Sequence, residues 1–225
     1  MYMRKILTIL PVIAVAAAAI YVLQPAPLSS PAQAKTPEPK LAIASKAKRE
    51  KAVFAGGCFW GVEGVFDHVK GVISARSGYA GGTAKTANYG AVSAGRTDHT
   101  EAVEITYDPS QIGYADLLRI FFSVAADPTT LNRQGPDVGR QYRTAIFPTS
   151  PDQAKMARAY IDQLTVAKSF ARPIVTKVEP SARFYPAEAK HQDFMAKHPN
   201  NGYIVVNDKP KVQALKKQFP TLYRS

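Results

Sequence analysis

The only cysteine of the chain, Cys58, follows a short apolar run and two glycines and precedes a helix-like stretch. One cysteine cannot form an internal disulfide, so the fold does not rely on one. The pattern predicts a buried strand at Val53–Gly56 and a helix at Phe59–His68, with Cys58 at the helix N-terminus. There, unpaired backbone N–H groups and the helix dipole favour an anion, which predicts a lowered thiol pKa and a reactive thiolate. The alternative is a small buried cysteine that fills a gap in the core.

Strand-like and helix-like segments continue to alternate after this unit, which indicates an α/β or α+β two-layer sandwich. A Gly-rich stretch over 79–98 is predicted to be loop. Asp127–Tyr142 shows neither the apolar period of a helix nor that of a strand. A loop as long as Asp127–Tyr142 is usually functional or disordered. Strands are predicted at Val72–Ser77, Ala102–Tyr107, Thr144–Phe147 and Ile174–Val178, and helices at Tyr114–Val124 and from Pro151, with Ser150 as N-cap, to about Ala167.

The N-terminus has the pattern of a targeting segment. Arg4 and Lys5 precede an apolar run, Ile6–Leu23, and Ala32-Gln33-Ala34 matches a cleavage site. Residues 1–34 are therefore predicted to be an export signal, with an uncleaved membrane anchor as the alternative. Either places the folded domain outside the cytoplasm, in the periplasm. The Pro- and Lys-rich residues 35–50 are predicted to be a flexible linker, followed by a folded domain over 51–225.

The chain carries a formal net charge of +12, and removal of residues 1–34, with two basic and no acidic residues, leaves +10. Such a surplus favours anionic lipids or envelope polymers. Because an exported chain rarely meets nucleic acid, we expect no nucleic-acid partner.

The sequence Gly57-Cys58-Phe59-Trp60-Gly61 resembles the signature of the A-type peptide methionine sulfoxide reductases, which reduce the S epimer of methionine sulfoxide. The resemblance covers about residues 51 to 205, and its blocks stand in the family's order. It implies a ferredoxin-like α+β core with long decorating loops. The other matching blocks are Gly78-Tyr79-Ala80-Gly81-Gly82, His99-Thr100-Glu101-Ala102-Val103-Glu104, Asp127 to Gly135, Asp137-Val138-Gly139 with Gln141-Tyr142-Arg143, Phe184-Tyr185-Pro186-Ala187-Glu188, and His191-Gln192-Asp193.

Reduction of a sulfoxide requires a nucleophile that attacks sulfur while the departing oxygen receives protons. The resemblance implies that Cys58 is this nucleophile and becomes a sulfenic acid as methionine leaves. It assigns the acid to Glu101, which the strand pattern places at a partly buried position that raises a carboxyl pKa. The remaining implied roles are hydroxyl donors to the sulfoxide oxygen for Tyr89 and Tyr142, orientation of a tyrosine, water or substrate backbone for Asp137, and the methyl pocket for Phe59 and Trp60.

The sequence departs from the family where many members carry further cysteines near the C-terminus, since Lys209–Ser225 contains none. An external thiol or a thioredoxin-like dithiol protein must therefore reduce the oxidised enzyme, without a cofactor. We expect a monomer that acts on oxidised proteins or on free methionine sulfoxide. Other departures from the family pattern are Ala126, Pro136, Arg140 and Phe194, the last in place of a tyrosine.

Three other functions are compatible with parts of the sequence. His99 and His191 suggest a metal, but no cysteine or carboxylate spacing completes a zinc set, so none is expected. A cysteine hydrolase or acyltransferase would need one of the four histidines, at 68, 99, 191 and 198, as base. A module that binds Met-rich or oxidised envelope proteins without turnover would not need the thiol at all.

Overall fold

The strand that leads to Cys58 lies inside a six-stranded sheet in the computed structural model, which describes residues 34–225. The strand order is β7-β6-β1-β3-β2-β8. Neighbouring strands are antiparallel except for β6 and β7, which are parallel. The strands of this sheet are β1 (Glu50–Gly56), β2 (Val72–Ala80), β3 (Thr100–Tyr107), β6 (Thr144–Phe147), β7 (Lys177–Val178) and β8 (Tyr185–Pro186).

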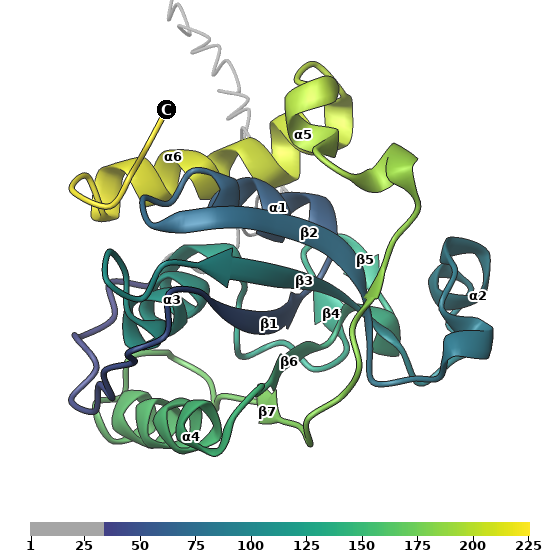
Figure 1. Ribbon diagram of the computed structural model, residues 1–225. Coiled ribbons are helices and arrows are strands. Elements are labelled where there is room, and N and C mark those ends of the chain that lie inside the picture. Colours follow the sequence, from purple (N-terminus) through teal and green to yellow (C-terminus); the bar gives the residue numbers. More distant parts are fainter. Residues whose placement is uncertain (1–33) are drawn as a thin grey trace, which may run out of the picture.

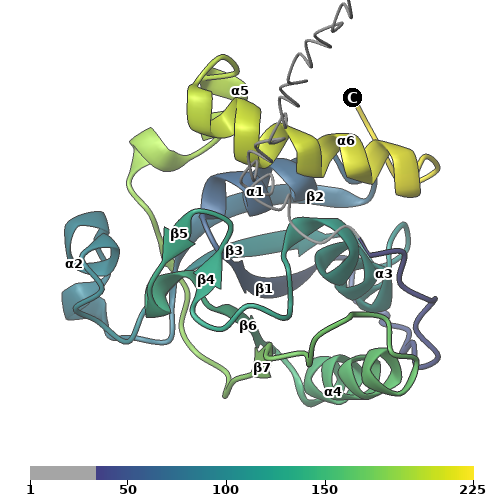
Figure 2. The ribbon, with the colours of Figure 1, turned by 180° about the vertical axis from the view of Figure 1, so that it is seen from behind.

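The central part of the chain runs β1-α1-β2-β3-α3-β6. Each helix in this order connects two strands that are not neighbours in the sheet, as in a split βαβ arrangement. Helices α1 and α6 lie side by side over the sheet, and α4 lies near β6 and β7 (Figures 1 and 2). The predicted α+β class is confirmed. The helices are α1 (Phe59–Asp67), α2 (Tyr89–Ser93), α3 (Tyr114–Ile120), α4 (Pro151–Val166), α5 (Phe194–Lys197) and α6 (Lys209–Gln218).

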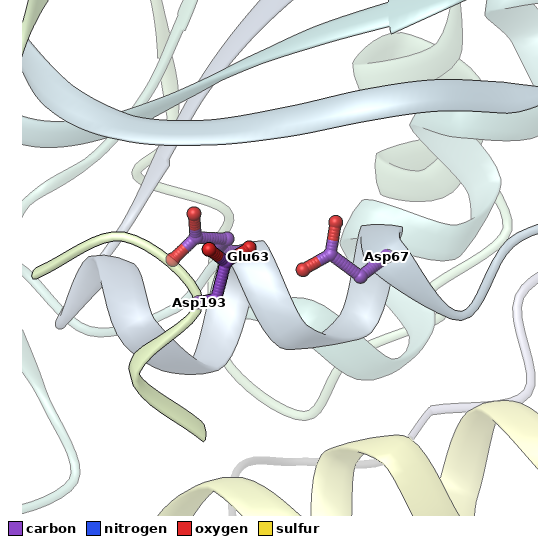
Figure 3. Close-up of side chains that lie close together, drawn as sticks. All are labelled: Glu63, Asp67 and Asp193. Carbon is purple, nitrogen blue, oxygen red and sulfur yellow. The ribbon is translucent and has the colours of Figure 1, made fainter. Parts of the chain in front are cut away.

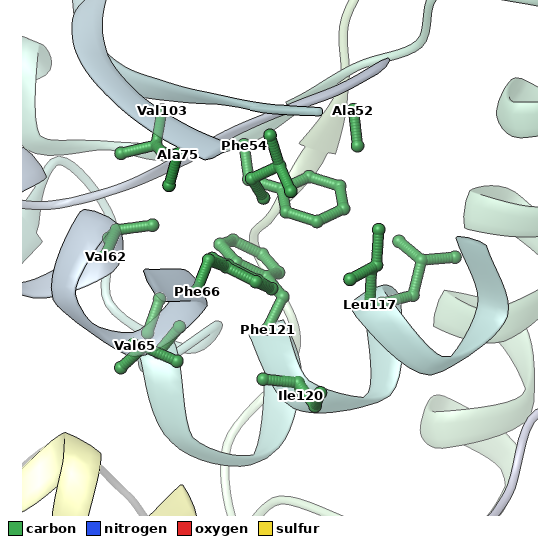
Figure 4. Close-up of a cluster of buried hydrophobic side chains, with 14 of the residues drawn as sticks. Ala52, Phe54, Val62, Val65, Phe66, Ala75, Val103, Leu117, Ile120 and Phe121 are labelled. Atoms are coloured by element: carbon green, nitrogen blue, oxygen red, sulfur yellow. The ribbon is translucent and has the colours of Figure 1, made fainter. Parts of the chain in front are cut away.

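The larger core lies between the sheet and the helices (Figure 4). At its centre the ring of Phe54, from β1, lies 5.7 Å from Phe66 of α1 and 5.0 Å from Phe121. All three side chains are fully buried. Burial of one such side chain stabilises the fold by roughly 1.5–3 kcal/mol. This packing fixes α1, and therefore the residue at its N-terminus, against the end of β1.

The opposite face of the sheet carries a smaller core of mostly alanine side chains. An irregular segment that includes Ala182 and Phe184 packs on it. Small side chains on this face allow coil, rather than helices, to lie close to the strands, which gives a sheet with helices mainly on one side. The buried members are Val53, Ala55, Ala80, Ala102, Ala145 and Phe147.

The predicted N-terminus of α4 is confirmed in detail. The Ser150 side chain accepts a hydrogen bond from the Gln153 backbone N–H at 3.2 Å. Gln153 in turn accepts one from the Thr149 backbone N–H at 3.0 Å, and Pro151 occupies the first helical position. Two backbone N–H groups at this helix end are thus satisfied by side chains.

The prediction of a flexible linker over 35–50 is wrong for its first half. Thr36 is buried and its hydroxyl bonds to that of Ser123 at 2.5 Å. Tyr160 donates a hydrogen bond to the Pro37 carbonyl at 2.8 Å, and Leu41 packs against the core. These contacts hold the segment against α3 and α4. A few apolar and hydroxyl groups of the segment find partners there, although the residues around them are polar.

Several loops contain more structure than their composition predicts. The stretch 79–98 contains the end of β2 and the short helix α2, and Asp127–Tyr142 contains a two-stranded hairpin of β4 (Arg133–Gln134) and β5 (Asp137–Val138). The helix predicted to Val124 ends as α3 at Ile120 and continues as a π-helical turn, and the strand predicted at Ile174–Val178 pairs only over its last two residues.

The predicted export signal, residues 1–34, lies almost entirely outside the described residues. Within 34–225 no helix combines the length and the apolar character needed to cross a bilayer.

Candidate active site

Cys58 lies at the sharp turn between β1 and α1 and is the N-cap of α1, as predicted. The turn requires glycine before it. Gly57 has φ +87°, and a Cβ there would lie 2.4 Å from the Gln134 side chain. A residue with a side chain would therefore be strained and would push the Gln134 loop away from the thiol.

The thiol is more buried than its position on a helix N-terminus predicts. Cys58 is 8% exposed, and burial, together with the nearby carboxyl groups of Glu101 and Asp208, raises the pKa of its thiol well above the usual value. The Trp60 backbone N–H and the Lys211 ammonium lower this pKa by less. The expectation of a lowered thiol pKa is thus wrong for the free protein, because desolvation outweighs the helix terminus. The resting group is a thiol that still holds its proton.

Glu101 lies on β3 and faces the same helix end. It is 2% exposed, so it is fully rather than partly buried. Its Oε2 accepts a hydrogen bond from the Phe59 backbone N–H at 3.0 Å. Burial raises the pKa of Glu101 to about 8. The hydrogen bond from Phe59 lowers this pKa, and the carboxyl groups of Asp137 and Asp208 raise it further. At pH 7 Glu101 is therefore mostly a neutral acid, and it holds a transferable proton beside the thiol.

One cavity of about 180 Å³ brings all the predicted residues together. Both predicted tyrosines line it, and burial raises the pKa of Tyr89 and of Tyr142. Both phenols therefore keep their protons near neutral pH and can donate hydrogen bonds. The cavity is lined by Cys58, Phe59, Trp60, Tyr89, Glu101, Asp137, Tyr142 and Tyr203.

One residue of this cavity, Tyr203, is absent from the sequence-based predictions. Its hydroxyl donates a short hydrogen bond to Asp137 Oδ2. Burial is the main cause that raises the pKa of Tyr203 and that of Asp137. The two residues are 66 positions apart, and no motif that we recognised includes Tyr203. Asp137 is thus observed to bond a tyrosine, one of the partners expected for it.

Further rings pack against the aromatic residues that line the cavity. The Phe194 ring lies 3.7 Å from the Trp60 ring at an interplanar angle of 8°. The centroid of the His191 ring lies 5.9 Å from that of Trp60, in a stacked arrangement, and 4.3 Å from that of Tyr89, in a tilted one. Phe194, where the family pattern has a tyrosine, therefore acts as a flat support for Trp60 in this structure.

A second cavity, of about 370 Å³, adjoins the first. Cys58, Asp137 and Tyr203 line both cavities, so the thiol lies where the two meet. Lys211 also lines the second cavity; it is buried and forms an ion pair with Asp208 at 3.2 Å. Sequence patterns gave no indication of this second approach to the sulfur.

The histidines do not complete a metal or hydrolase site around the thiol. His99 is buried, and its two ring nitrogens bond the Gly82 N–H at 3.2 Å and the Thr83 carbonyl at 2.9 Å. No histidine lines either cavity that Cys58 reaches among the described residues. Over residues 34–225, the one cluster that could hold a metal lies elsewhere and contains no histidine.

Comparisons with known proteins agree with this geometry. The family described as peptide methionine sulfoxide reductase matches residues 50–222. The chain belongs to this family. A peptide methionine sulfoxide reductase MsrA 2 of Mesorhizobium japonicum is 58% identical over 174 residues, covering 77% of this chain and 89% of the relative. An MsrA 2 of Synechocystis is 55% identical over 170 residues, covering 76% and 79% of the two chains.

Two solved structures share this fold. Reduced Mxr1 from Saccharomyces cerevisiae superposes with a TM-score of 0.61 at 31% identity, over 72% of this chain and 92% of that one. Methionine sulfoxide reductase A of Corynebacterium diphtheriae superposes with a TM-score of 0.58 at 32% identity, over 78% and 86%. The protein is therefore an oxidoreductase, a peptide methionine sulfoxide reductase of the A type.

Proposed function

We propose that this reductase converts methionine S-sulfoxide, free or in proteins, to methionine through a sulfenic acid on Cys58. One observation carries the proposal: Cys58, Glu101, whose raised pKa keeps it mostly protonated at pH 7, and the tyrosines Tyr89 and Tyr142 line the same 180 Å³ cavity. Phe59 and Trp60 supply apolar surface for the methyl group. The preference for the S epimer follows from the family resemblance.

The proposed first step transfers oxygen from the substrate to Cys58. The cysteine sulfur attacks the sulfoxide sulfur, while Glu101 gives its proton to the sulfoxide oxygen and Tyr89 and Tyr142 donate hydrogen bonds to it. The attack forms a temporary bond between the two sulfurs. The S–O bond of the substrate then breaks, the hydroxyl group bonds to the Cys58 sulfur, and the S–S bond breaks with its electron pair going to methionine, which leaves Cys58 as a sulfenic acid. The thiol proton replaces the one that Glu101 lost. The step therefore has no net proton uptake, and a protonated resting thiol does not prevent it.

In the second part of the cycle an external thiol attacks the sulfenic acid. Water leaves, a mixed disulfide forms, and a second thiol releases Cys58 as the free thiol together with an oxidised disulfide. Since Cys58 is the only cysteine, the protein supplies neither of these thiols. We assign the reductant's approach to the 370 Å³ cavity, which reaches the same sulfur from another side. A thioredoxin-like dithiol protein suits this role because its second thiol resolves the mixed disulfide.

We further propose that the enzyme is exported, to the periplasm, and repairs oxidised proteins there. Arg4, Lys5, the apolar run Ile6–Leu23 and the Ala32-Gln33-Ala34 motif support this proposal. Mass spectrometry that identifies the N-terminal residue of the protein purified from the cell envelope tests this proposal. A chain that begins after Ala34 supports a cleaved signal, and an intact N-terminus supports an anchor. Recovery of the protein from the cytoplasm alone contradicts export.

The stoichiometry without reductant tests the proposed cycle. One equivalent of methionine S-sulfoxide should yield one methionine per chain and abolish the free thiol. A sulfenic-acid probe should then label Cys58, as mass spectrometry of the labelled peptide can verify, and dithiothreitol should restore multiple turnovers. Two equivalents of methionine per chain without reductant would mean that electrons come from elsewhere, and the mechanism would be abandoned.

The raised pKa of Glu101 predicts a basic limb in the pH profile. Because the acid form is lost as pH rises through about 8, the single-turnover rate of methionine formation should fall above that pH. The rate should be nearly constant from pH 6 to 7, where Glu101 stays protonated. Rapid-quench measurements across this range provide the test, and a rate that climbs steadily from pH 7 to 9 would show that thiolate formation, not the acid, limits the step.

A further inference from the structure

Three carboxyl groups lie close together (Figure 3), and none of the three residues lines either cavity that Cys58 reaches. Glu63 and Asp67 come from successive turns of α1, and Asp193 comes from the residue before α5. One oxygen from each group lies within 4.8 Å of the others. No other set of three or more histidine, cysteine, aspartate or glutamate side chains comes as close within the described part of the chain.

Glu63 distinguishes this cluster from an ordinary acidic surface. Its side chain is 1% exposed, and its Oε2 accepts a hydrogen bond from the Ser77 hydroxyl at 2.9 Å. Its Oε1 is buried and has no hydrogen-bond partner. A buried acceptor without a partner is unfavourable, and more so if it is charged. A cation bound by the cluster would give the Glu63 carboxyl group a further partner.

We propose that Glu63, Asp67 and Asp193 bind one Ca²⁺ ion. Three oxygens no more than 4.8 Å apart lie at most about 2.8 Å (4.8 Å divided by √3) from a common point. Ca²⁺ binds oxygens at roughly 2.3–2.6 Å in flexible geometry, whereas Mg²⁺ needs roughly 2.0–2.1 Å and near-ideal octahedral angles. A small movement of the exposed Asp193 side chain brings the three oxygens to Ca²⁺ distance, and water completes the shell.

The charges around the cluster suit a divalent ion. Lys197 forms an ion pair with Asp193 Oδ2 at 3.0 Å, so the other oxygen, Oδ1, can bind the ion. Lys197 and a dication together balance three carboxylates. The Arg224 guanidinium acts on Asp67 from outside the triangle.

The proposed ion would connect two elements that shape the reductase cavity. Asp193 directly precedes Phe194, whose ring stacks on Trp60 at 3.7 Å. Glu63 lies one helical turn after Trp60 on α1. Ca²⁺ would therefore tie α1 to the segment that supports the Trp60 ring. We expect it to raise the melting temperature and to hold this aromatic wall in place.

Terbium luminescence tests the site, because Tb³⁺ replaces Ca²⁺ at oxygen sites and Trp60, the only tryptophan, can sensitise it. Titration of the full chain with Tb³⁺ and excitation of tryptophan should give a saturable signal that Ca²⁺ displaces more effectively than Mg²⁺. Asp67→Asn and Asp193→Asn should each weaken Ca²⁺ binding by about tenfold or more. Asp162→Asn, which removes an exposed carboxylate of α4, is the matched control and should bind like the wild type.

The proposal fails if Tb³⁺ gives no saturable signal, if Mg²⁺ competes as well as Ca²⁺, or if Asp67→Asn and Asp193→Asn bind as the wild type does. Circular dichroism establishes that the variants are folded, and both altered residues are less buried than Glu63, so their loss of binding would not reflect a collapsed core. A melting temperature that Ca²⁺ raises in the wild type and in Asp162→Asn, but not in the other two variants, would independently support the site.

Discussion

Cys58→Ser should lower the reduction of methionine S-sulfoxide by at least about 10⁴-fold, the order of magnitude that loss of a nucleophile costs. Serine keeps the size and the N-cap position of the residue, but its hydroxyl is a far weaker nucleophile towards sulfur. With no second cysteine in the chain, nothing can replace the lost thiol. Methionine formation with excess dithiothreitol, measured by chromatography, gives the rate.

The thermal melt of this variant is its control, because the fold does not depend on the thiol and a serine fits at a helix N-cap. A folded variant with activity within tenfold of the wild type would contradict a role for Cys58 as nucleophile. Full function of Cys58→Ser in cells would instead favour the alternative of a module that binds oxidised proteins without turnover.

The local parts of the fold could be predicted from the sequence because their causes are local. The strand that ends at Gly56, the glycine turn and the helix that starts at Phe59 follow from apolar periodicity and from the need for positive φ at Gly57. The Ser150 cap of α4 follows likewise from neighbouring side chains. Such patterns need no knowledge of distant contacts.

Residues 35–43 could not be predicted, since their contacts are remote. Thr36 bonds to Ser123, 87 positions away, and the Lys40 N–H donates to Gln163, 123 positions away. A Pro- and Lys-rich composition is typical of solvated linkers, and it does not reveal a groove formed by two later helices. Burial of a few hydroxyl and apolar groups is enough to dock the segment.

In the site, too, the sequence predicted which residues are present better than it predicted their surroundings. The resemblance named the residues that line the cavity, but their protonation depends on packing. The helix N-terminus at Cys58 suggested a low pKa, whereas burial, with the carboxyl groups of Glu101 and Asp208, raises it. Tyr203 was missed because only the fold brings it to Asp137. Local sequence therefore identified the reacting groups better than it predicted the charge state in which they rest.

Glu101→Gln should slow sulfoxide reduction by roughly 10²–10⁴-fold, the usual contribution of a general acid. Glutamine keeps an oxygen that can accept the Phe59 N–H hydrogen bond, now 3.0 Å long, so the turn at Cys58 should persist. It has no acidic proton for the departing sulfoxide oxygen. The single-turnover rate at pH 7 measures the loss, and the basic limb near pH 8 should disappear from the profile of the variant.

The alkylation rate of Cys58 by iodoacetamide distinguishes proton donation from tuning of the thiol. At pH 7 Glu101 is mostly neutral, so replacing it with a neutral amide changes the field at the sulfur little, and alkylation should stay close to the wild-type rate. Glu104→Gln is the matched control: it lies on the same strand, pairs with Lys51 at 3.1 Å, and lines neither cavity, so both rates should be preserved. If reduction and alkylation fall together in Glu101→Gln, the residue acts on the thiol rather than on the substrate oxygen, and its assignment as the acid is wrong.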